Sequence, residues 1–173
     1  MDETALAQLR VIHRVSSVLS AADVNAWLFG GWGLDARIGR VTRRHGDIEF
    51  WVERVDGDRS AATLVAAGAT ELSTQPPEEA REFTWDGLDF STAYFDRRAD
   101  GTSAQVQGRW DDWLFPPDSL DDVPVSLEGV QVLAMSIAGM LAMKQQYPTL
   151  RHGGPWRDKD VADMATLRGL LAD

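Results

Sequence analysis

The chain contains no cysteine among its 173 residues, and it is poor in basic side chains. The absence of cysteine excludes disulfides and thiolate metal sites, and nothing in the composition indicates an oxidising compartment. Lys and Arg number 17 against 27 Asp and Glu, which gives a formal net charge of −10. Proteins that bind nucleic-acid polymers or anionic membranes usually present a basic face, because neutralised phosphates supply most of the affinity. The charge balance therefore argues against both kinds of partner.

Long hydrophobic runs are also missing. The longest stretch without a charged residue spans 129–143, which is shorter than the roughly 20 apolar residues of a membrane helix. Asp2 and Glu3 stand where a secretory signal would carry basic residues, so we expect a cytoplasmic protein. We also expect one domain over 1–173, with a sheet-containing core over about 1–128 and a helical part over about 129–173.

The apolar spacing predicts helices and strands in alternation. The predicted helices span about 6–19, 32–38, 58–67, 134–146 and 157–171, and the predicted strands span 26–29, 47–53, 81–85 and 88–95. Asp86-Gly87 is a favoured two-residue hairpin turn, and it would pair Trp85 with Leu88. This order predicts an α+β (or α/β) fold, in which a small mixed sheet is flanked by helices.

The clearest predicted strand carries two acids on one face. Asp47 and Glu49 alternate with Ile48, Phe50 and Val52 over 47–53. Side chains two residues apart on a strand leave the same face about 6.5 Å apart. Both carboxylates could therefore converge on one or two Mg²⁺ ions, which prefer oxygen ligands. Taken alone, the same pair fits a solvated polar strand face, which is the commoner arrangement.

Glycines and cations precede this strand. Gly30-Gly31 lies between a predicted strand and a predicted helix, where glycine lets the backbone approach a phosphate. An ordinary tight turn between a strand and a helix would carry the same two glycines. A basic loop follows. Its basic side chains are Arg37, Arg40, Arg43, Arg44 and His45. Guanidinium groups suit triphosphate oxygens, but a solvated loop that balances nearby acids is an equal alternative.

A third carboxylate would activate a hydroxyl nucleophile or complete a metal site. Asp89 is the best candidate because it lies between Leu88 and Phe90 in an apolar strand. Burial of an unpaired carboxylate there would be costly, so we expect Asp89 to face the site.

Two adjacent segments carry a family resemblance. Residues 27–37 read WLFGGWGLDAR, and residues 39–49 read GRVTRRHGDIE. They resemble the antibiotic nucleotidyltransferases of the polymerase-β-like superfamily, most of all the aminoglycoside 2″-nucleotidyltransferases and more distantly the lincosamide nucleotidyltransferases. Those proteins carry Gly-Gly-Trp and then Arg-x-His-x-Asp-x-Asp at matching spacing. Weaker similarity continues at 87–90, 143–144 and 159–163.

The resemblance implies a nucleotidyltransferase fold with a C-terminal helical part. It implies an Mg²⁺-dependent enzyme, with two ions, that moves a nucleoside monophosphate from a nucleoside triphosphate such as ATP to a hydroxyl of an aminoglycoside-type antibiotic and releases pyrophosphate. The implied catalytic and metal-binding carboxylates are Asp47, Glu49 and Asp89, and the implied nucleotide-binding residues are Gly30, Gly31, Arg43 and Arg44.

One departure from the family pattern favours an alternative function. The second acid of the strand is usually Asp, whereas here it is Glu49. The extra methylene could shift metal geometry by about 1 Å, and such a shift can cost about 100-fold in rate. The alternative is a catalytically weak or inactive nucleotidyltransferase-fold protein that serves as a binding or antitoxin-like partner.

An acidic stretch bears on the acceptor. No Lys or Arg occurs between Arg109 and Lys144. The acids in that stretch are Asp111, Asp112, Asp118, Asp121, Asp122 and Glu128. Such a surface would attract a cationic small-molecule acceptor, but a solvated acidic loop is at least as common.

Overall fold

The computed structural model describes residues 2–72, 76–105, 113–150 and 154–172. The helices are α1 (Glu3–Ala21), α2 (Gly30–Ile38), α3 (Gly57–Ala66), α4 (Ile137–Leu150) and α5 (Asp158–Ala172), with a 3₁₀ turn at Arg54–Asp56. The strands are β1 (Ala26–Leu28), β2 (Glu49–Glu53), β3 (Thr70–Leu72), β4 (Ala80–Trp85), β5 (Leu88–Arg97), β6 (Ser103–Gln105), β7 (Leu114–Phe115), β8 (Val125–Leu127) and β9 (Val130–Ala134).

The strands form a mixed sheet in the order β3-β4-β5-β2-β1-β9-β8. β6 continues the sheet beside β5, and β7 pairs with β6. β2 runs parallel to β5 and antiparallel to β1, and β1 runs parallel to β9. The prediction of an α+β fold with a small mixed sheet and flanking helices is confirmed.

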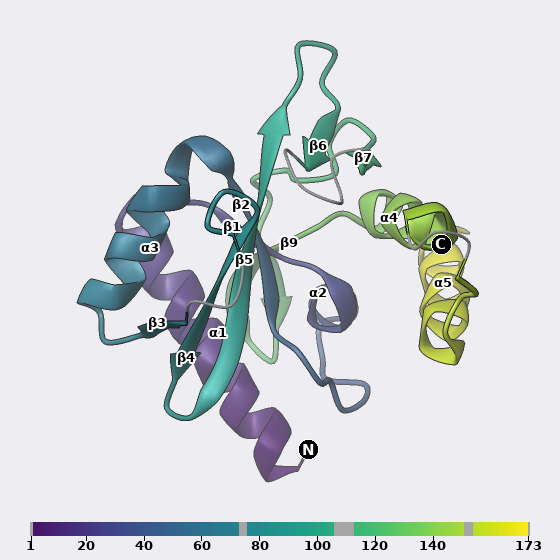
Figure 1. The fold of residues 1–173 in the computed structure, drawn as a ribbon. Coiled ribbons are helices and arrows are strands. Elements are labelled where there is room, and N and C mark those ends of the chain that lie inside the picture. Colours follow the sequence, from purple (N-terminus) through teal and green to yellow (C-terminus); the bar gives the residue numbers. More distant parts are fainter. Residues whose placement is uncertain (1, 73–75, 106–112, 151–153, 173) are drawn as a thin grey trace.

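Two apolar clusters lie on opposite faces of this sheet. α1 and α3 cover one face, whereas α4 and α5 lie on the other side (Figure 1). Ile48, Phe50 and Val52 are buried in the cluster with α1, while Trp51 is buried in the cluster with α4. The face assignment made from the alternation over 47–53 is therefore confirmed.

The hairpin between β4 and β5 forms at the predicted turn. Trp85 pairs with Leu88, and Thr84 pairs with Asp89. Asp86 and Gly87 both have positive φ, at 53° and 77°, which matches the right-handed twist of a two-residue hairpin.

Several boundaries differ from the predictions. α2 begins at Gly30 rather than at Trp32, and β2 begins at Glu49, so Asp47 lies just before the strand. β9 was not expected: it pairs with β1 inside the sheet, and the helical part begins at Ile137. Within the ranges that the structure describes, no helix is both long and apolar enough to cross a membrane.

Candidate active site

A cavity of about 300 Å³ opens on the α4 and α5 side of the sheet. Its walls come from the start of α2, the loop before β2, the strands β2 and β5, and the helices α4 and α5. Gly30, Gly31, Arg43, Asp47 and Glu49 all line it. The structure thus brings together five of the seven site residues predicted from the sequence.

Two glycines at the start of α2 allow close packing around the cavity. Gly30 has a φ of +63°, and a Cβ there would lie 2.8 Å from an oxygen of Glu49. A Cβ on Gly31 would lie 2.2 Å from Nδ1 of His45. No side chain caps the first turn of α2. Its free N–H groups and the helix dipole therefore make this turn a suitable binding place for an anion.

Asp47 and Glu49 lie side by side at the cavity. Asp47 is exposed, whereas Glu49 is half-buried. Burial, and then the charge of Asp47, raise the pKa of Glu49 from its ordinary value of 4.5 to about 7, against opposing contributions from Lys159 and Lys144. A carboxylate pair that is costly to ionise suits a hard divalent cation such as Mg²⁺. Among the described residues, no group of three or more His, Asp or Glu side chains forms a metal cluster.

Asp89 does not line this cavity. Its side chain is exposed, and the residue pairs with Thr84 close to the hairpin turn. Ser91, two residues further along the same face of β5, pairs with Glu49 and lines the cavity. β5 extends past the start of β2, so Asp89 lies beyond the strand that carries Glu49. The role predicted for Asp89 stays a prediction.

The basic loop divides between the cavity and the surface. Arg43 lines the cavity, but Arg44 is exposed, pairs with Asp2 at 3.2 Å and does not line it. Arg37 donates instead to the carbonyl of Met135 at 3.0 Å. The loop is therefore not one cluster of phosphate-binding arginines.

His45 holds the loop in place. It is buried, and its Nε2 lies 2.6 Å from Oδ2 of Asp35. The same Asp35 oxygen accepts from the backbone N–H of Thr42 at 3.0 Å. These contacts tie both ends of the loop to α2.

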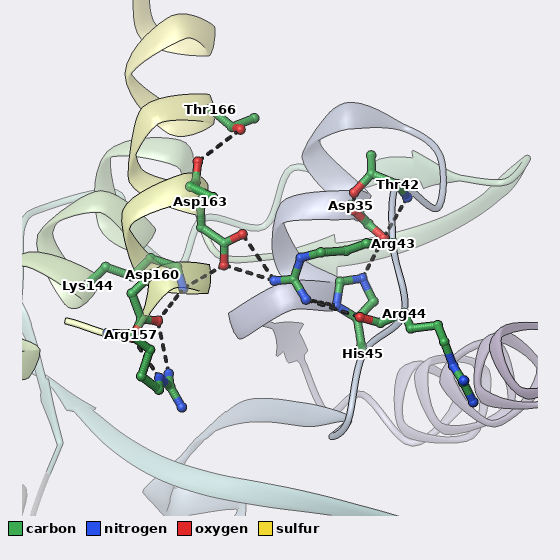
Figure 2. A network of polar contacts seen from close by, with 11 residues as sticks. Asp35, Thr42, Arg43, Arg44, His45, Lys144, Arg157, Asp160, Asp163 and Thr166 are labelled. Atoms are coloured by element: carbon green, nitrogen blue, oxygen red, sulfur yellow. Dashed lines mark hydrogen bonds and ion pairs between the residues drawn. The ribbon is translucent and has the colours of Figure 1, made fainter.

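Sequence reasoning gave no role to the cations that α4, the start of α5 and the residue before α5 bring to the cavity. Lys144, Arg157 and Lys159 all line it. The network in Figure 2 joins Lys144 and Arg157 to Asp160 and Asp163. Two signals were available in the sequence: the weaker family similarity at 143–144 and 159–163, and the spacing of Asp160 and Asp163, which puts both acids on one face of a helix.

Aromatic side chains form part of the cavity wall. Trp113 lies between Trp51 and Tyr147, with ring centroids 5.8 Å and 5.6 Å away. Glu79 and Gln105 line the same cavity. Trp51 Nε1 and Gln105 Oε1 are buried, and neither has a hydrogen-bond partner within the described part of the chain.

The acidic stretch expected to attract an acceptor lies largely elsewhere. Asp121 pairs with Arg37 at 3.5 Å, and Asp122 accepts from Asn25 at 2.9 Å. Neither of these acids lines the cavity, nor does Glu128. Residues 111–112 lie outside the described ranges.

Solved structures share this fold. The chain aligns over 95% of its length, and 90% of the other chain, with the crystal structure of ANT(2″)-Ia in complex with adenylyl-2″-tobramycin, at a TM-score of 0.75 and 19% identity. For a lincomycin-bound lincosamide antibiotic adenylyltransferase, the TM-score is 0.67 at 17% identity, with 97% of each chain covered. The fold is therefore that of a nucleotidyltransferase.

The sequence comparison shows to which family the chain belongs. The aminoglycoside-2″-adenylyltransferase profile matches residues 11–167, and the chain belongs to this family. A segment of 50 residues, 29% of the chain, is 43% identical to 2″-aminoglycoside nucleotidyltransferases of Escherichia coli and Klebsiella pneumoniae. The matched segment spans 27% of the length of these curated relatives.

Proposed function

We propose that this protein transfers a nucleoside monophosphate from a nucleoside triphosphate to a hydroxyl of an aminoglycoside-type antibiotic. The observation that carries the proposal is the position of Asp47 and Glu49 beside the uncapped first turn of α2, in one cavity with several cations. Family membership and the adenylyl-2″-tobramycin bound to a protein of the same fold support this choice of acceptor.

The triphosphate would lie against the start of α2. The N–H groups of Gly30 and Gly31 would bind phosphate oxygens, since no side chain competes for them. Arg43 borders this turn, and Lys159 lines the cavity as an exposed cation. Arg44 could reach a phosphate only by leaving Asp2, so we assign it a minor part.

Asp47 and Glu49 would hold Mg²⁺. Their oxygens are ligands of the kind that this ion prefers, and the ion would neutralise phosphate charge when bound. Ser91 lies directly across from Glu49 and leaves space next to it, because its side chain is small.

The reaction exchanges one P–O bond for another. The acceptor oxygen bonds to the α-phosphorus, the bond to the β-phosphate oxygen breaks, and pyrophosphate leaves with that electron pair. The hydroxyl proton passes to a base. Asp89 is the base predicted from the sequence, and its position outside the cavity makes Asp89→Asn an informative variant.

The acceptor would bind beside the aromatic side chains of the cavity wall. Trp113 and Tyr147 offer ring faces to a sugar, and Glu79 offers a carboxylate to an ammonium group. A cationic acceptor therefore fits the cavity through Glu79 rather than through Asp121 and Asp122.

A pyrophosphate-release screen tests the proposal. Four nucleoside triphosphates are crossed with a panel of aminoglycosides and lincosamides in the presence of Mg²⁺. We expect turnover with at least one aminoglycoside, and a loss of at least about 100-fold in Asp47→Asn. Asp122→Asn, an acid outside the cavity, is the matched control. Absence of turnover with every pair, or full turnover in Asp47→Asn, would overturn the assignment.

A further inference from the structure

Asp163 of α5 lies between two cations from distant parts of the chain. One of its oxygens is 3.0 Å from Nη2 of Arg43 and 2.9 Å from Nζ of Lys144, and the other is 3.1 Å from the same Arg43 nitrogen. The side chains of Asp163 and Lys144 are only 5% and 3% exposed. A single buried carboxylate therefore serves two cations on the cavity wall (Figure 2).

The second terminal nitrogen of the Arg43 guanidinium is also held. Nη1 donates to the carbonyl of Arg44 at 3.2 Å and lies 3.0 Å from Nδ1 of His45. A guanidinium group can only donate hydrogen bonds, so Nδ1 of His45 accepts one. Nε2 of His45 then carries the ring hydrogen and donates a hydrogen bond to Asp35. The orientation of the Arg43 guanidinium is thus set from two sides, with Asp163 on one and His45 on the other.

The oriented guanidinium lies against the start of α2. A Cβ on Gly31 would be 3.2 Å from Nη2 of Arg43. The first turn of α2 has no side-chain cap. The guanidinium and the free N–H groups together form a positive surface, and its shape depends on where Arg43 is held.

We propose that Asp163 is a positioning residue for triphosphate binding, acting through Arg43. This inference rests on the proposed function. If Asp163 is replaced by Asn, Nη2 of Arg43 loses one of its two acceptor oxygens to an amide group that can only donate, and two neighbouring cations lose their shared counter-ion. Arg43 then turns away from Gly31, and the phosphate-binding surface is lost.

A purely structural role makes a different prediction. Asp163 also ties α5 to α4 through Lys144, so its removal could simply loosen the helical part. That effect would lower thermal stability whether or not Arg43 is present. A positioning role instead requires that the effect on triphosphate affinity disappears when the Arg43 guanidinium is absent.

Calorimetric titration with ATP and Mg²⁺ tests this inference without any acceptor. We expect Asp163→Asn to raise Kd by about 10- to 100-fold, and Asp163→Glu to recover part of the affinity. Asp158→Asn, a change to an exposed acid of the same helix outside the cavity, should leave Kd unchanged. In an Arg43→Gln background, Asp163→Asn should change Kd by less than about twofold.

Two results would overturn the positioning role. They are wild-type affinity in Asp163→Asn, and an undiminished effect of that substitution in the Arg43→Gln background. If Asp163→Asn does not fold, Arg43→Lys replaces it. A lysine cannot bond both Asp163 and His45, and we expect a Kd about tenfold higher; unchanged affinity would refute the inference. A wild-type protein that binds no nucleoside triphosphate would refute the proposed function itself.

Discussion

Replacing Glu49 by Gln should stabilise the metal-free protein at alkaline pH. Burial and the charge of Asp47 raise the pKa of Glu49 from 4.5 to about 7 in the folded state. Between these two values the folded chain keeps a proton that the unfolded chain has released. Raising the pH through this window therefore favours unfolding, and the destabilisation is complete above the folded pKa.

The magnitude follows from the size of this pKa change. At about 1.4 kcal/mol per pKa unit, a rise from 4.5 to about 7 is worth between about 3 and 4 kcal/mol. Glu49 is half-buried, and solvent reaching its carboxylate reduces the effect to between about 1 and 3 kcal/mol. Glu49→Gln removes this cost, because the amide carries no charge at any pH. The variant should thus gain stability relative to wild type as the pH rises.

Urea unfolding followed by tryptophan fluorescence measures the difference. With EDTA present, the free energy of unfolding of Glu49→Gln minus that of wild type should rise by about 1 to 3 kcal/mol between pH 5 and pH 8.5. Glu53→Gln, at the other end of β2 and outside the cavity, is the matched control. A Glu49→Gln difference that stays the same at both pH values would refute the assignment of Glu49 as a partly desolvated carboxyl beside the charge of Asp47.

Two further substitutions test the geometry around the cavity. Gly31→Ala places a Cβ 2.2 Å from Nδ1 of His45; it should cost about 1–3 kcal/mol of stability in thermal unfolding and weaken triphosphate binding in calorimetry. Wild-type values for both would contradict the close packing. Ser91→Asp adds a carboxylate directly opposite Glu49 and should raise Mn²⁺ affinity about tenfold, measured by calorimetry, because extra charged ligands strengthen such sites. Ser126→Asp on β8, away from the cavity, should leave the Mn²⁺ affinity unchanged. The same Mn²⁺ affinity in both variants would contradict the position of Ser91 opposite Glu49.

The sequence predicts well whatever depends on local patterns. Alternation along β2 separates Phe50, which is buried with α1, from Trp51, which is buried on the side of the cavity. The Asp86-Gly87 turn forms because both residues tolerate positive φ. The glycines at 30–31 could be recognised because a Cβ has little room between the end of a strand and the first turn of a helix.

The register in which β2 pairs with β5 cannot be predicted from such local patterns. The parallel register sets Ser91, not Asp89, opposite Glu49. That register depends on contacts between segments about 40 residues apart, which period-two alternation leaves open. The strand pattern therefore places Asp89 and Ser91 on one face of β5, but it does not determine which of the two lies opposite Glu49.

The contribution of the C-terminal helices was missed for a related reason. Periodicity predicts that 157–171 is helical, but it does not say which end of the helix reaches the cavity. The hairpin of β8 and β9 was missed because the uncharged run at 129–143 obscures the alternation over 125–134. Its turn has positive φ at Glu128 and Gly129, which is the remaining local signal.

The separation of Arg43 from Asp163 has a consequence for how the protein acquires its site during synthesis. The two residues that share an ion pair are 120 positions apart. At about 5 to 20 residues per second, a ribosome needs roughly 6 to 24 s to make the intervening chain. The glycine turn and the two acids of the cavity are thus translated long before the carboxylate that orients Arg43. A nascent chain lacking α5 carries most of the residues proposed to contact the nucleotide, without their final arrangement.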